Sequence, residues 1–234
     1  LVMPAMHMNY TPDGEVNETL IAFYRERAKG GVGLILIGGC PVEAEAGSAF
    51  MIGINDDRFV PGLTRFAKAM HEEGAKCGVQ LYHAGRYTYS FFLNGGQAPS
   101  ASATFSPLTK EMSYEMSLDD IKKCQDDFRL AARRAMAARF DTVEVIASAG
   151  YLISQFLSPL TNKRTDAYGG SFENRARFGV EVLRAVKEEV GPEVPVCVRL
   201  AGNDFVPGSN GNDENAAFAQ LLEEAGAAFF NVTG

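Results

Sequence analysis

The sequence predicts an α/β protein, specifically a (β/α)8 TIM barrel of which the 234 residues cover about the first six strands. Short runs of Val, Ile and Leu alternate with longer amphipathic segments, which is typical of parallel strands that are buried on both faces and joined by helices. Glycines such as Gly74 and Gly226 stand between a predicted helix and the next strand, where left-handed helix C-caps are common. This regular repeat predicts successive βα units in one domain.

Six strands are expected in chain order. They are the apolar start of the chain at 1–6 and the runs 33–37, 78–82, 142–146, 196–200 and 228–232. The helices between them are expected at 18–29, 61–73, 117–138, 172–189 and 214–225. In the third of these helices, Ser117 and Asp120 match a capping box, and Ile121, Cys124 and Phe128 recur at helical spacing.

Two architectures can use six parallel strands. An open doubly wound sheet would normally carry a GxGxxG phosphate-binding turn after its first strand, and the sequence has none there. A complete barrel takes about 250 residues, whereas six strands already occupy this chain up to its end. We therefore predict one barrel domain over residues 1–234 that is incomplete, without the last two βα units and any C-terminal domains.

The composition favours a small-molecule partner. A formal net charge of -7 and a pI near 5.1 disfavour nucleic-acid binding, which needs clustered Lys and Arg. No apolar run approaches the roughly 18 residues that cross a bilayer, and no signal segment precedes the first strand, so we expect no membrane partner and a cytoplasmic location. The four cysteines form no CxxC pair and are expected to be reduced and structural, with only Cys40 placed to approach a ligand.

Polar groups follow the predicted strands at the edge where barrel active sites are built. They are Met6–His7, Gln80 with His83, the start of the long loop at Gly150–Tyr151, and Arg199. Each alone is more often structural, but four groups on one edge favour a binding site. A flavin fits this set, because an amide matches the donors and acceptors of its pyrimidine edge and an arginine stabilises the negative charge of the reduced ring. Gln80 and Arg199 would take these two roles.

Five ordered motifs resemble the Old Yellow Enzyme family of flavin-dependent ene-reductases, in particular its 2,4-dienoyl-CoA reductase and 2-enoate reductase branch. They are VMPAMHMNY at 2–10, RAKGGVGLILIGG at 27–39, VQLYHAGR at 79–86, GYLISQFLSPLTNKRTDAYGGSFENRARF at 150–178 and PVCVRL at 195–200. The resemblance covers essentially the whole chain. It implies an FMN-binding barrel that passes hydride from NADH or NADPH, through flavin N5, to an activated C=C bond.

The resemblance also implies roles for single residues. The backbone of Ala5 and Met6 and the small Gly39 would line the flavin ring, which Gln80 and Arg199 would hold. His7 matches a position that tunes the ring's potential. Tyr151 matches the tyrosine that donates a proton to the substrate. Because a phenol is a weak acid, we expect Tyr151 to have a partner; without the resemblance, a packing role for Tyr151 would be favoured.

Two positions depart from the family pattern. Classical members place a His–Asn or His–His pair after the fourth strand to bind the substrate carbonyl, but Ile146 and Ala149 stand there and cannot donate. His83 and Arg86 could contact the substrate or a phosphate, or could equally anchor their loop. The charged and polar residues of the long loop are expected to form a structural network. They are Arg164, Asp166, Glu173, Asn174 and Arg177. His71 is expected to be a solvated surface side chain.

The leading hypothesis is an FMN-dependent ene-reductase that acts on an unsaturated acid, thioester or enone. One alternative is an oxidative amine demethylase similar to trimethylamine dehydrogenase, for which a cation-binding bowl could come from Tyr87, Tyr89, Phe91 and Phe92. Another is a non-catalytic barrel fragment, whose open edges would need a partner or a homo-oligomer. If the chain continues beyond Gly234, the resemblance predicts a 4Fe-4S cluster and an FAD- and NAD(P)H-binding region.

Overall fold

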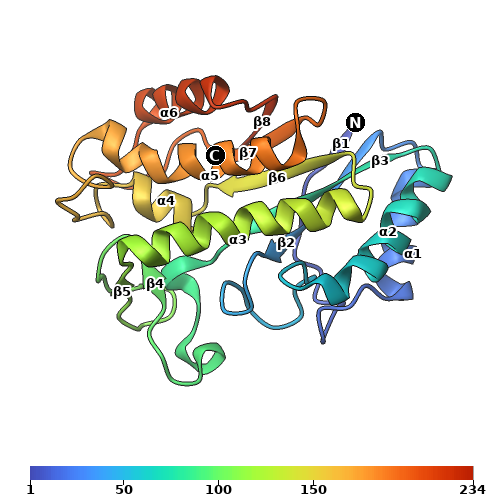
Figure 1. The fold of residues 1–234 in the computed structure, drawn as a ribbon, viewed down its shortest axis with the longest axis horizontal. Coiled ribbons are helices and arrows are strands. Elements are labelled where there is room, and N and C mark those ends of the chain that lie inside the picture. Colours follow the sequence, from blue (N-terminus) through green and yellow to red (C-terminus); the bar gives the residue numbers. More distant parts are fainter. Residues whose placement is uncertain (234) are drawn as a thin grey trace.

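A computed structural model describes residues 1–233, whose main sheet is a curved, six-stranded parallel sheet covered by helices (Figure 1). The six strands are hydrogen-bonded in the order β1-β2-β3-β6-β7-β8, and every pairing is parallel. Their bounds are β1 Val2–Met3, β2 Leu34–Pro41, β3 Lys76–Tyr82, β6 Thr142–Ala147, β7 Val196–Ala201 and β8 Phe229–Thr233.

The strand order decides between the two architectures. A doubly wound sheet contains a point at which the strand order reverses. Here the order along the chain and the order in space coincide, so the sheet has no such point. With crossovers of one hand, every connecting helix then packs on the same face, and the sheet curves as a barrel wall does. The structure is therefore a half-barrel of six parallel strands, as predicted.

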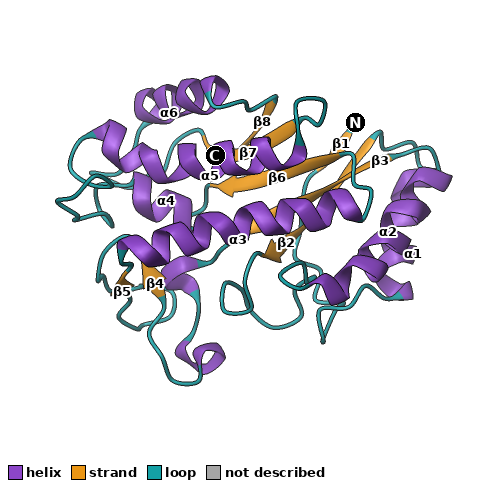
Figure 2. Ribbon diagram, in the orientation of Figure 1, coloured by secondary structure: helices purple, strands orange, loops and turns teal. Residues whose placement is uncertain are grey.

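Five long helices form the outer layer, and α3 and α5 cross in front of the strands in Figure 2. Their bounds are α1 Glu18–Lys29, α2 Val60–Glu72, α3 Leu118–Ala137, α5 Phe172–Val190 and α6 Asn212–Glu224. All five lie within a few residues of their predicted positions. The shorter elements are η1 Asp57–Phe59, η2 Gly85–Tyr87, η3 Ser90–Leu93, α4 Leu152–Leu157 and the two-stranded parallel sheet β4 Pro99–Ser100 with β5 Tyr114–Glu115.

Helix ends follow the local chemistry of the sequence. Ser117 and Asp120 form the predicted capping box at the start of α3, in which each side chain accepts a hydrogen bond from the other residue's backbone N–H. Gly74 and Gly226 have the expected positive φ, 80° and 107°. Two glycines, Gly30 and Gly31, follow α1. Only Gly31 is left-handed, with φ 89°, because Gly30 still belongs to the last helical turn at φ -71°.

The core lies between the strands and the helix layer. All four cysteines are buried and unpaired, as expected for structural thiols. Cys40 is fully buried too, and among residues 1–233 it lines none of the hollows described below, so the structure does not support an approach to a ligand. Within the same residues, no helix is both long and apolar enough to cross a membrane.

The segment 150–178 is not one long loop, which corrects the reading of the sequence. Helix α4 lies inside it, and its residues Leu152, Ile153 and Phe156 are buried. Phe156 stacks on Phe178 of α5, with ring centroids 4.3 Å apart. A helix of six residues is shorter than two turns, so it has no clear periodicity in the sequence and is stabilised by this tertiary packing.

Candidate functional site

A hollow of about 310 Å³ opens at the carboxyl end of the sheet. Because all six strands are parallel, residues at their carboxyl ends converge on this one edge. The hollow brings together six of the predicted site residues, namely Ala5, His7, Gly39, Gln80, Tyr151 and Arg199. Ile146, Ala149, Tyr82 and Thr233 complete most of its wall, with Ser48 and Met51 at the side.

The amide of Gln80 is held by a carboxylate that the sequence reading did not single out. Glu144 lies opposite Gln80 in the β3–β6 pairing and is fully buried. Gln80 Nε2 donates to Glu144 Oε1 at 2.6 Å, and Glu144 Oε2 accepts from Asn231 Nδ2 at 3.1 Å and from the Cys197 thiol at 3.2 Å. Because the NH2 of Gln80 faces Glu144, the amide Oε1 is left for a ligand.

Arg199 brings a positive charge to the hollow. It follows the buried β7 residues Cys197 and Val198 and is half-buried at the wall. Within residues 1–233, its guanidinium has neither an ion pair nor a hydrogen-bond acceptor. A half-buried cation of this kind is stabilised by an anionic or strongly accepting ligand.

Tyr151 stands at the entrance to α4 as its N-cap residue. Its ring packs edge-on against Tyr82, with centroids 4.6 Å apart, and against Tyr87 at 6.2 Å. Burial and the neighbouring Tyr151 phenol raise the pKa of Tyr82 far above its ordinary value, so Tyr82 stays protonated. Tyr82 is therefore a neutral phenol packed beside Tyr151, and its role as the expected partner of Tyr151 stays a prediction.

Gln155 of α4 fixes the backbone that carries Tyr151. Its Nε2 donates to the carbonyls of Gly150 at 2.7 Å and Ala84 at 3.0 Å, and its Oε1 accepts from the N–H of Arg86 at 3.0 Å and the hydroxyl of Ser100 at 3.1 Å. These four bonds tie the loops after β3 and β6 to β4. No local sequence pattern indicated this role, because the partners lie far apart in the chain and α4 itself was not expected.

Tyr82 gives Gly39 a second reason to be small, besides the expected one. Gly39 does line the hollow, and a Cβ built at this position would come within 2.9 Å of the Tyr82 side chain. Real Cβ atoms essentially never approach a neighbour so closely. The close approach of Tyr82 therefore demands the glycine, with or without a flavin.

Met6, His83 and Arg86 do not line this hollow. Met6 is exposed, and the ring of His83 is buried at 2% exposure. His83 Nδ1 accepts from the N–H of Gly85 at 3.0 Å, so Nε2 carries the hydrogen that is shared with Glu43 Oε1 at 2.9 Å. These contacts favour the loop-anchor alternative for His83.

Arg86 borders a second hollow of about 410 Å³, which shares Ala149 and Thr233 with the first. Its guanidinium donates to the carbonyl of Phe105 at 3.2 Å and lies 5.4 Å from the Tyr87 ring centroid. Its buried Nε has no hydrogen-bond partner among residues 1–233. Arg86 thus keeps a donor beside the site, and a substrate contact remains a prediction for it.

The aromatic cluster after β3 forms no bowl around the first hollow. Phe91 and Phe92 pack on each other at 5.4 Å, and Phe91 is 84% exposed. Tyr89 is exposed as well, and only Tyr87 reaches one of the two hollows. The arrangement does not support a cation-binding cage at this position.

Glu43 makes the stability of this region dependent on pH. Burial raises its pKa, but its hydrogen bond to His83 and the Lys123 ammonium outweigh burial and lower the pKa to about 2. A depressed carboxyl pKa stabilises the fold above the ordinary glutamate pKa of about 4.3, and this stabilisation is lost as the pH falls toward 2. Glu43→Gln should therefore lower the melting temperature at pH 7, with a difference from the native protein that narrows below pH 4.

The matched control for this prediction is Glu45→Gln, because Glu45 is exposed two residues further along the same loop. It should change the melting temperature little at any pH. Thermal unfolding of the three proteins between pH 7 and pH 2.5 tests the assignment. A difference between Glu43→Gln and the native protein that does not vary with pH would show that the carboxylate charge is not what stabilises the loop.

The hollow fits a flavin by the chemistry of its wall. It offers an amide with a free acceptor, an unpaired cation, small residues at Ala5 and Gly39 and a phenol, all on one edge. An isoalloxazine needs donors and acceptors along its pyrimidine edge and a positive charge near N1 and O2. Gln80 and Arg199 meet these needs.

The sequence model of the NADH:flavin oxidoreductase / NADH oxidase family matches residues 1–233. A metal reductase of Desulforamulus reducens is 52% identical over the whole chain, which spans 35% of that protein. An N,N-dimethylglycine/sarcosine dehydrogenase of Chromohalobacter salexigens is 36% identical over 96% of the chain, which spans 33% of that protein. A solved complex of 2-naphthoyl-CoA reductase with 2-naphthoyl-CoA superposes with a TM-score of 0.93 at 32% identity, covering 99% of this chain and 38% of that one. The chain thus spans about a third of the length of these relatives.

Proposed function

Since the chain belongs to the NADH:flavin oxidoreductase / NADH oxidase family, which is the Old Yellow Enzyme family, we propose that residues 1–234 are the FMN-binding domain of an ene-reductase. Proteins of this family use FMN and NAD(P)H. When bound, FMN would supply hydride transfer from NADH or NADPH to the activated C=C bond of an unsaturated acid, thioester or enone. The solved 2-naphthoyl-CoA reductase, which superposes on this chain and is bound to a CoA thioester, supports the choice of a thioester.

One observation carries the proposal. The unpaired guanidinium of Arg199 and the oriented amide of Gln80 share a hollow with the phenol of Tyr151. Arg199 would bind the electron-rich side of the flavin pyrimidine, and Gln80 would accept from its N–H through Oε1. Ala5 and Gly39 would leave room for the ring, and His7 would stand at its edge.

Tyr151 would deliver the proton that completes reduction of the double bond. Its phenol lies in the same hollow as the two flavin-binding groups and beside the protonated Tyr82, which can donate a hydrogen bond to the phenolate as it forms. Ile146 and Ala149 line the hollow without a side-chain donor, so polarisation of the substrate carbonyl would fall to other groups. Arg86, with its unpartnered Nε in the adjoining hollow, is the candidate for a carboxylate or another anionic part of the substrate.

Amine oxidation is the second candidate, because one relative is a dimethylglycine and sarcosine dehydrogenase. The two reactions differ in the direction of hydride transfer. Anaerobic mixing of the oxidised protein with sarcosine, and of the reduced protein with an enoyl thioester, separates them by the bleaching or the recovery of the flavin absorbance. Bleaching by sarcosine without recovery by the thioester would overturn the ene-reductase proposal.

Arg199→Ala should weaken FMN binding by about 10- to 100-fold, the effect of losing a hydrogen bond to a charged group. Fluorescence titration of the flavin-free full-length protein with FMN measures this change directly. Arg199→Lys is the matched control, because it keeps the charge and loses only the planar guanidinium, so it should bind more tightly than Arg199→Ala. Equal FMN affinity in the native and Arg199→Ala proteins would remove Arg199 from the flavin site.

A further inference from the structure

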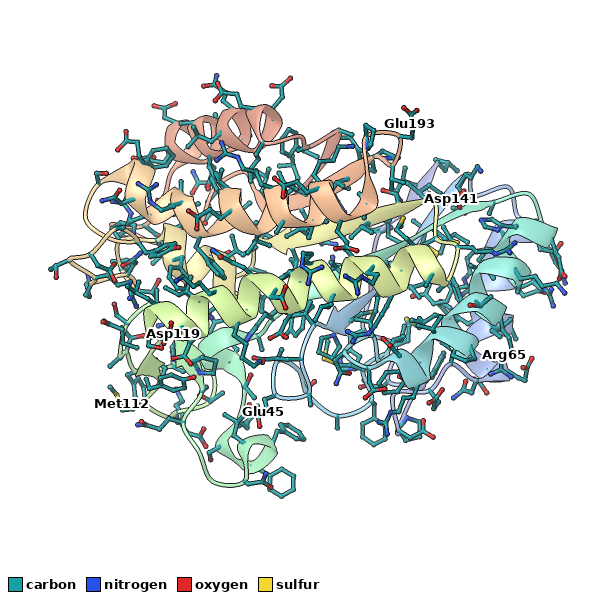
Figure 3. The ribbon with its side chains drawn as sticks, viewed as in Figure 1. Glu45, Arg65, Met112, Asp119, Asp141 and Glu193 are labelled. Atoms are coloured by element: carbon teal, nitrogen blue, oxygen red, sulfur yellow. The ribbon has the colours of Figure 1, made fainter. Side chains whose placement is uncertain are left out.

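A cluster of potential metal ligands lies at the end of the sheet opposite to the hollow. His71 is in the last turn of α2, Cys77 is the second residue of β3, and Asp141 immediately precedes β6. Figure 3 labels Asp141 at the amino end of β6. Sequence reading expected His71 to be a solvated surface residue, but its imidazole bonds to Asp141 across 70 positions of the chain.

The three ligand atoms are close to one another. His71 Nε2 lies 2.7 Å from Asp141 Oδ2 and 3.8 Å from Cys77 Sγ, and all three ligand atoms fall within 4.8 Å of each other. No other group of three or more His, Cys, Asp or Glu residues within positions 1–233 has this spacing. The thiol is buried, whereas the imidazole is 36% exposed, so the cluster has one side in protein and one side in solvent.

We propose that His71, Cys77 and Asp141 bind one divalent transition-metal ion of the zinc class, with a water molecule in the fourth position. A tetrahedral zinc ion bonds to sulfur at about 2.3 Å and to nitrogen or oxygen at about 2.0–2.2 Å, which places neighbouring ligand atoms roughly 3.3–3.7 Å apart. The distance of 3.8 Å between sulfur and imidazole exceeds the roughly 3.5–3.6 Å expected for that pair by about 0.2–0.3 Å. The imidazole and carboxylate, 2.7 Å apart, need to separate by about 0.6–0.8 Å, which the exposed side of the cluster permits.

Groups around the carboxylate would hold it in place for the metal. Lys76 Nζ donates to Asp141 Oδ1 at 2.7 Å, and the N–H of Cys77 donates to Oδ2 at 2.9 Å. Burial raises the pKa of Asp141, but the bonds from Lys76, Cys77 and His71 outweigh it, so the pKa is lowered and the carboxylate is ionised at neutral pH. Outer hydrogen bonds of this kind typically orient the ligands of a metal site.

Metal binding would release the thiol proton. The metal–sulfur bond forms as this proton leaves to solvent, and His71 binds through Nε2 with its remaining hydrogen on Nδ1.

The bound ion would join α2 to the starts of β3 and β6. Because a ligand that binds only the folded state stabilises it, zinc should raise the melting temperature. The amino end of a barrel contributes to stability and carries no catalytic loops, so the flavin spectrum should stay unchanged. These effects need no flavin and do not rest on the proposed function.

Cobalt titration of the full-length protein tests the proposal, since Co²⁺ enters zinc sites and a thiolate ligand gives it a charge-transfer band in the near ultraviolet. The native protein should develop one saturable band that Zn²⁺ abolishes, and Cys77→Ser should lack it. Cys124→Ser is the matched control, because Cys124 is a buried thiol on α3, outside the cluster, and this variant should keep the band. A difference spectrum between native protein and Cys77→Ser removes the signal of any other cysteine.

His71→Gln gives a second test that does not alter a buried position. Its affinity for Co²⁺ should fall by more than about tenfold, since loss of even an outer hydrogen-bond partner of a ligand costs about 10–100-fold. Failure of Co²⁺ to produce the band in native protein at pH 8 would overturn the proposal and leave a hydrogen-bonded cluster of His71, Asp141 and Lys76. Persistence of the full band in Cys77→Ser would overturn it as well.

Discussion

Tyr151→Phe should slow the reduction of an unsaturated substrate by about 100-fold or more, the range that a positioned general acid contributes. The substitution keeps the edge-on packing against Tyr82 at 4.6 Å and removes only the hydroxyl. Reduction of the flavin by NADH involves no proton from Tyr151, so the rate of that half-reaction should not change. The effect should therefore appear in kcat for substrate reduction and not in flavin binding.

Stopped-flow absorbance at the flavin band measures the two half-reactions separately, with a cyclic enone and an enoyl thioester as oxidants. Tyr87→Phe is the matched control: its ring also packs on Tyr151, at 6.2 Å, but it lines only the second hollow. This variant should reduce both oxidants at close to the native rate. An unchanged rate for Tyr151→Phe would remove the phenol from the mechanism and leave Tyr151 with a packing role.

Tyr82→Phe would then distinguish a lone acid from a pair. The raised pKa of Tyr82 means that it stays a neutral phenol through the working range of pH, so it can stabilise the Tyr151 phenolate only as a hydrogen-bond donor. Loss of this donor should slow proton delivery less than loss of Tyr151 itself. The two hydroxyls together explain how a weak acid could serve in this position.

The sequence predicted the barrel because its signals are local. Apolar runs mark the buried strands, and the capping box at Ser117 and the left-handed Gly74 and Gly226 mark helix ends within a few residues. Strand order follows from the same alternation, since each βα unit places the next strand beside the last one. Helix α4 was missed because six residues give too little periodicity, and only packing on α5 stabilises them.

The site was predicted in part. Residues in the carboxyl-terminal half of a strand, such as Gln80 in β3 and Arg199 in β7, were placed correctly at one hollow, because the edge of a parallel sheet can be inferred from chain position. Glu144 was missed, since a carboxylate inside an apolar strand is recognisable only from its partners Gln80, Asn231 and Cys197, which lie 53 to 87 positions away. Gln155 was missed for the same reason.

The charged residues of the segment 158–178 show how such distant contacts hold the site. Arg175 donates to the carbonyls of Leu157, at the end of α4, and of Gly170, and Arg177 donates to the carbonyl of Ala167. Asn174 Nδ2 donates to the carbonyl of Gly169 at 3.0 Å. The expected network is therefore present in part, with Arg175 as an unexpected member. Among the described residues, Glu173 makes no side-chain contact to another charged group of the network.

Arg164 is the buried centre of this network. Its guanidinium donates to both oxygens of Asp166, at 2.6 to 3.2 Å, and to the carbonyls of Ala101 at 3.0 Å and Met116 at 2.7 Å. It thereby joins the segment after α4 to the loop that carries β4 and β5. Ser100 in β4 binds Gln155, so the same loop also supports the helix that positions Tyr151.

Arg164→Met should destabilise the segment by about 3–5 kcal/mol, because each of two buried carbonyls, those of Ala101 and Met116, loses its donor at a cost of about 1–3 kcal/mol. The Asp166 carboxylate is exposed, so water replaces its lost bonds. Methionine keeps most of the side-chain volume, so the effect comes from lost hydrogen bonds more than from a cavity. Hydrogen exchange of the full-length protein, followed at the backbone amides of residues 161–169, should be roughly 100-fold faster or more, since each 1.4 kcal/mol of opening free energy is about a factor of ten. These amides are suitable probes because the N–H groups of Thr161, Asn162 and Gly169 are bonded within the segment.

Arg177→Met is the control that separates burial from charge. Arg177 belongs to the same network and makes two hydrogen bonds, to the carbonyl of Ala167 and to Asn174 Oδ1, each at 2.8 Å, but its side chain is exposed. Water can replace both bonds there, so the cost should be about 1 kcal/mol or less. Equal acceleration of exchange in the two variants would show that Arg164 acts as an ordinary surface charge; a large effect in Arg164→Met alone, accompanied by slower proton delivery from an otherwise intact Tyr151, would show that its buried bonds position the catalytic loop.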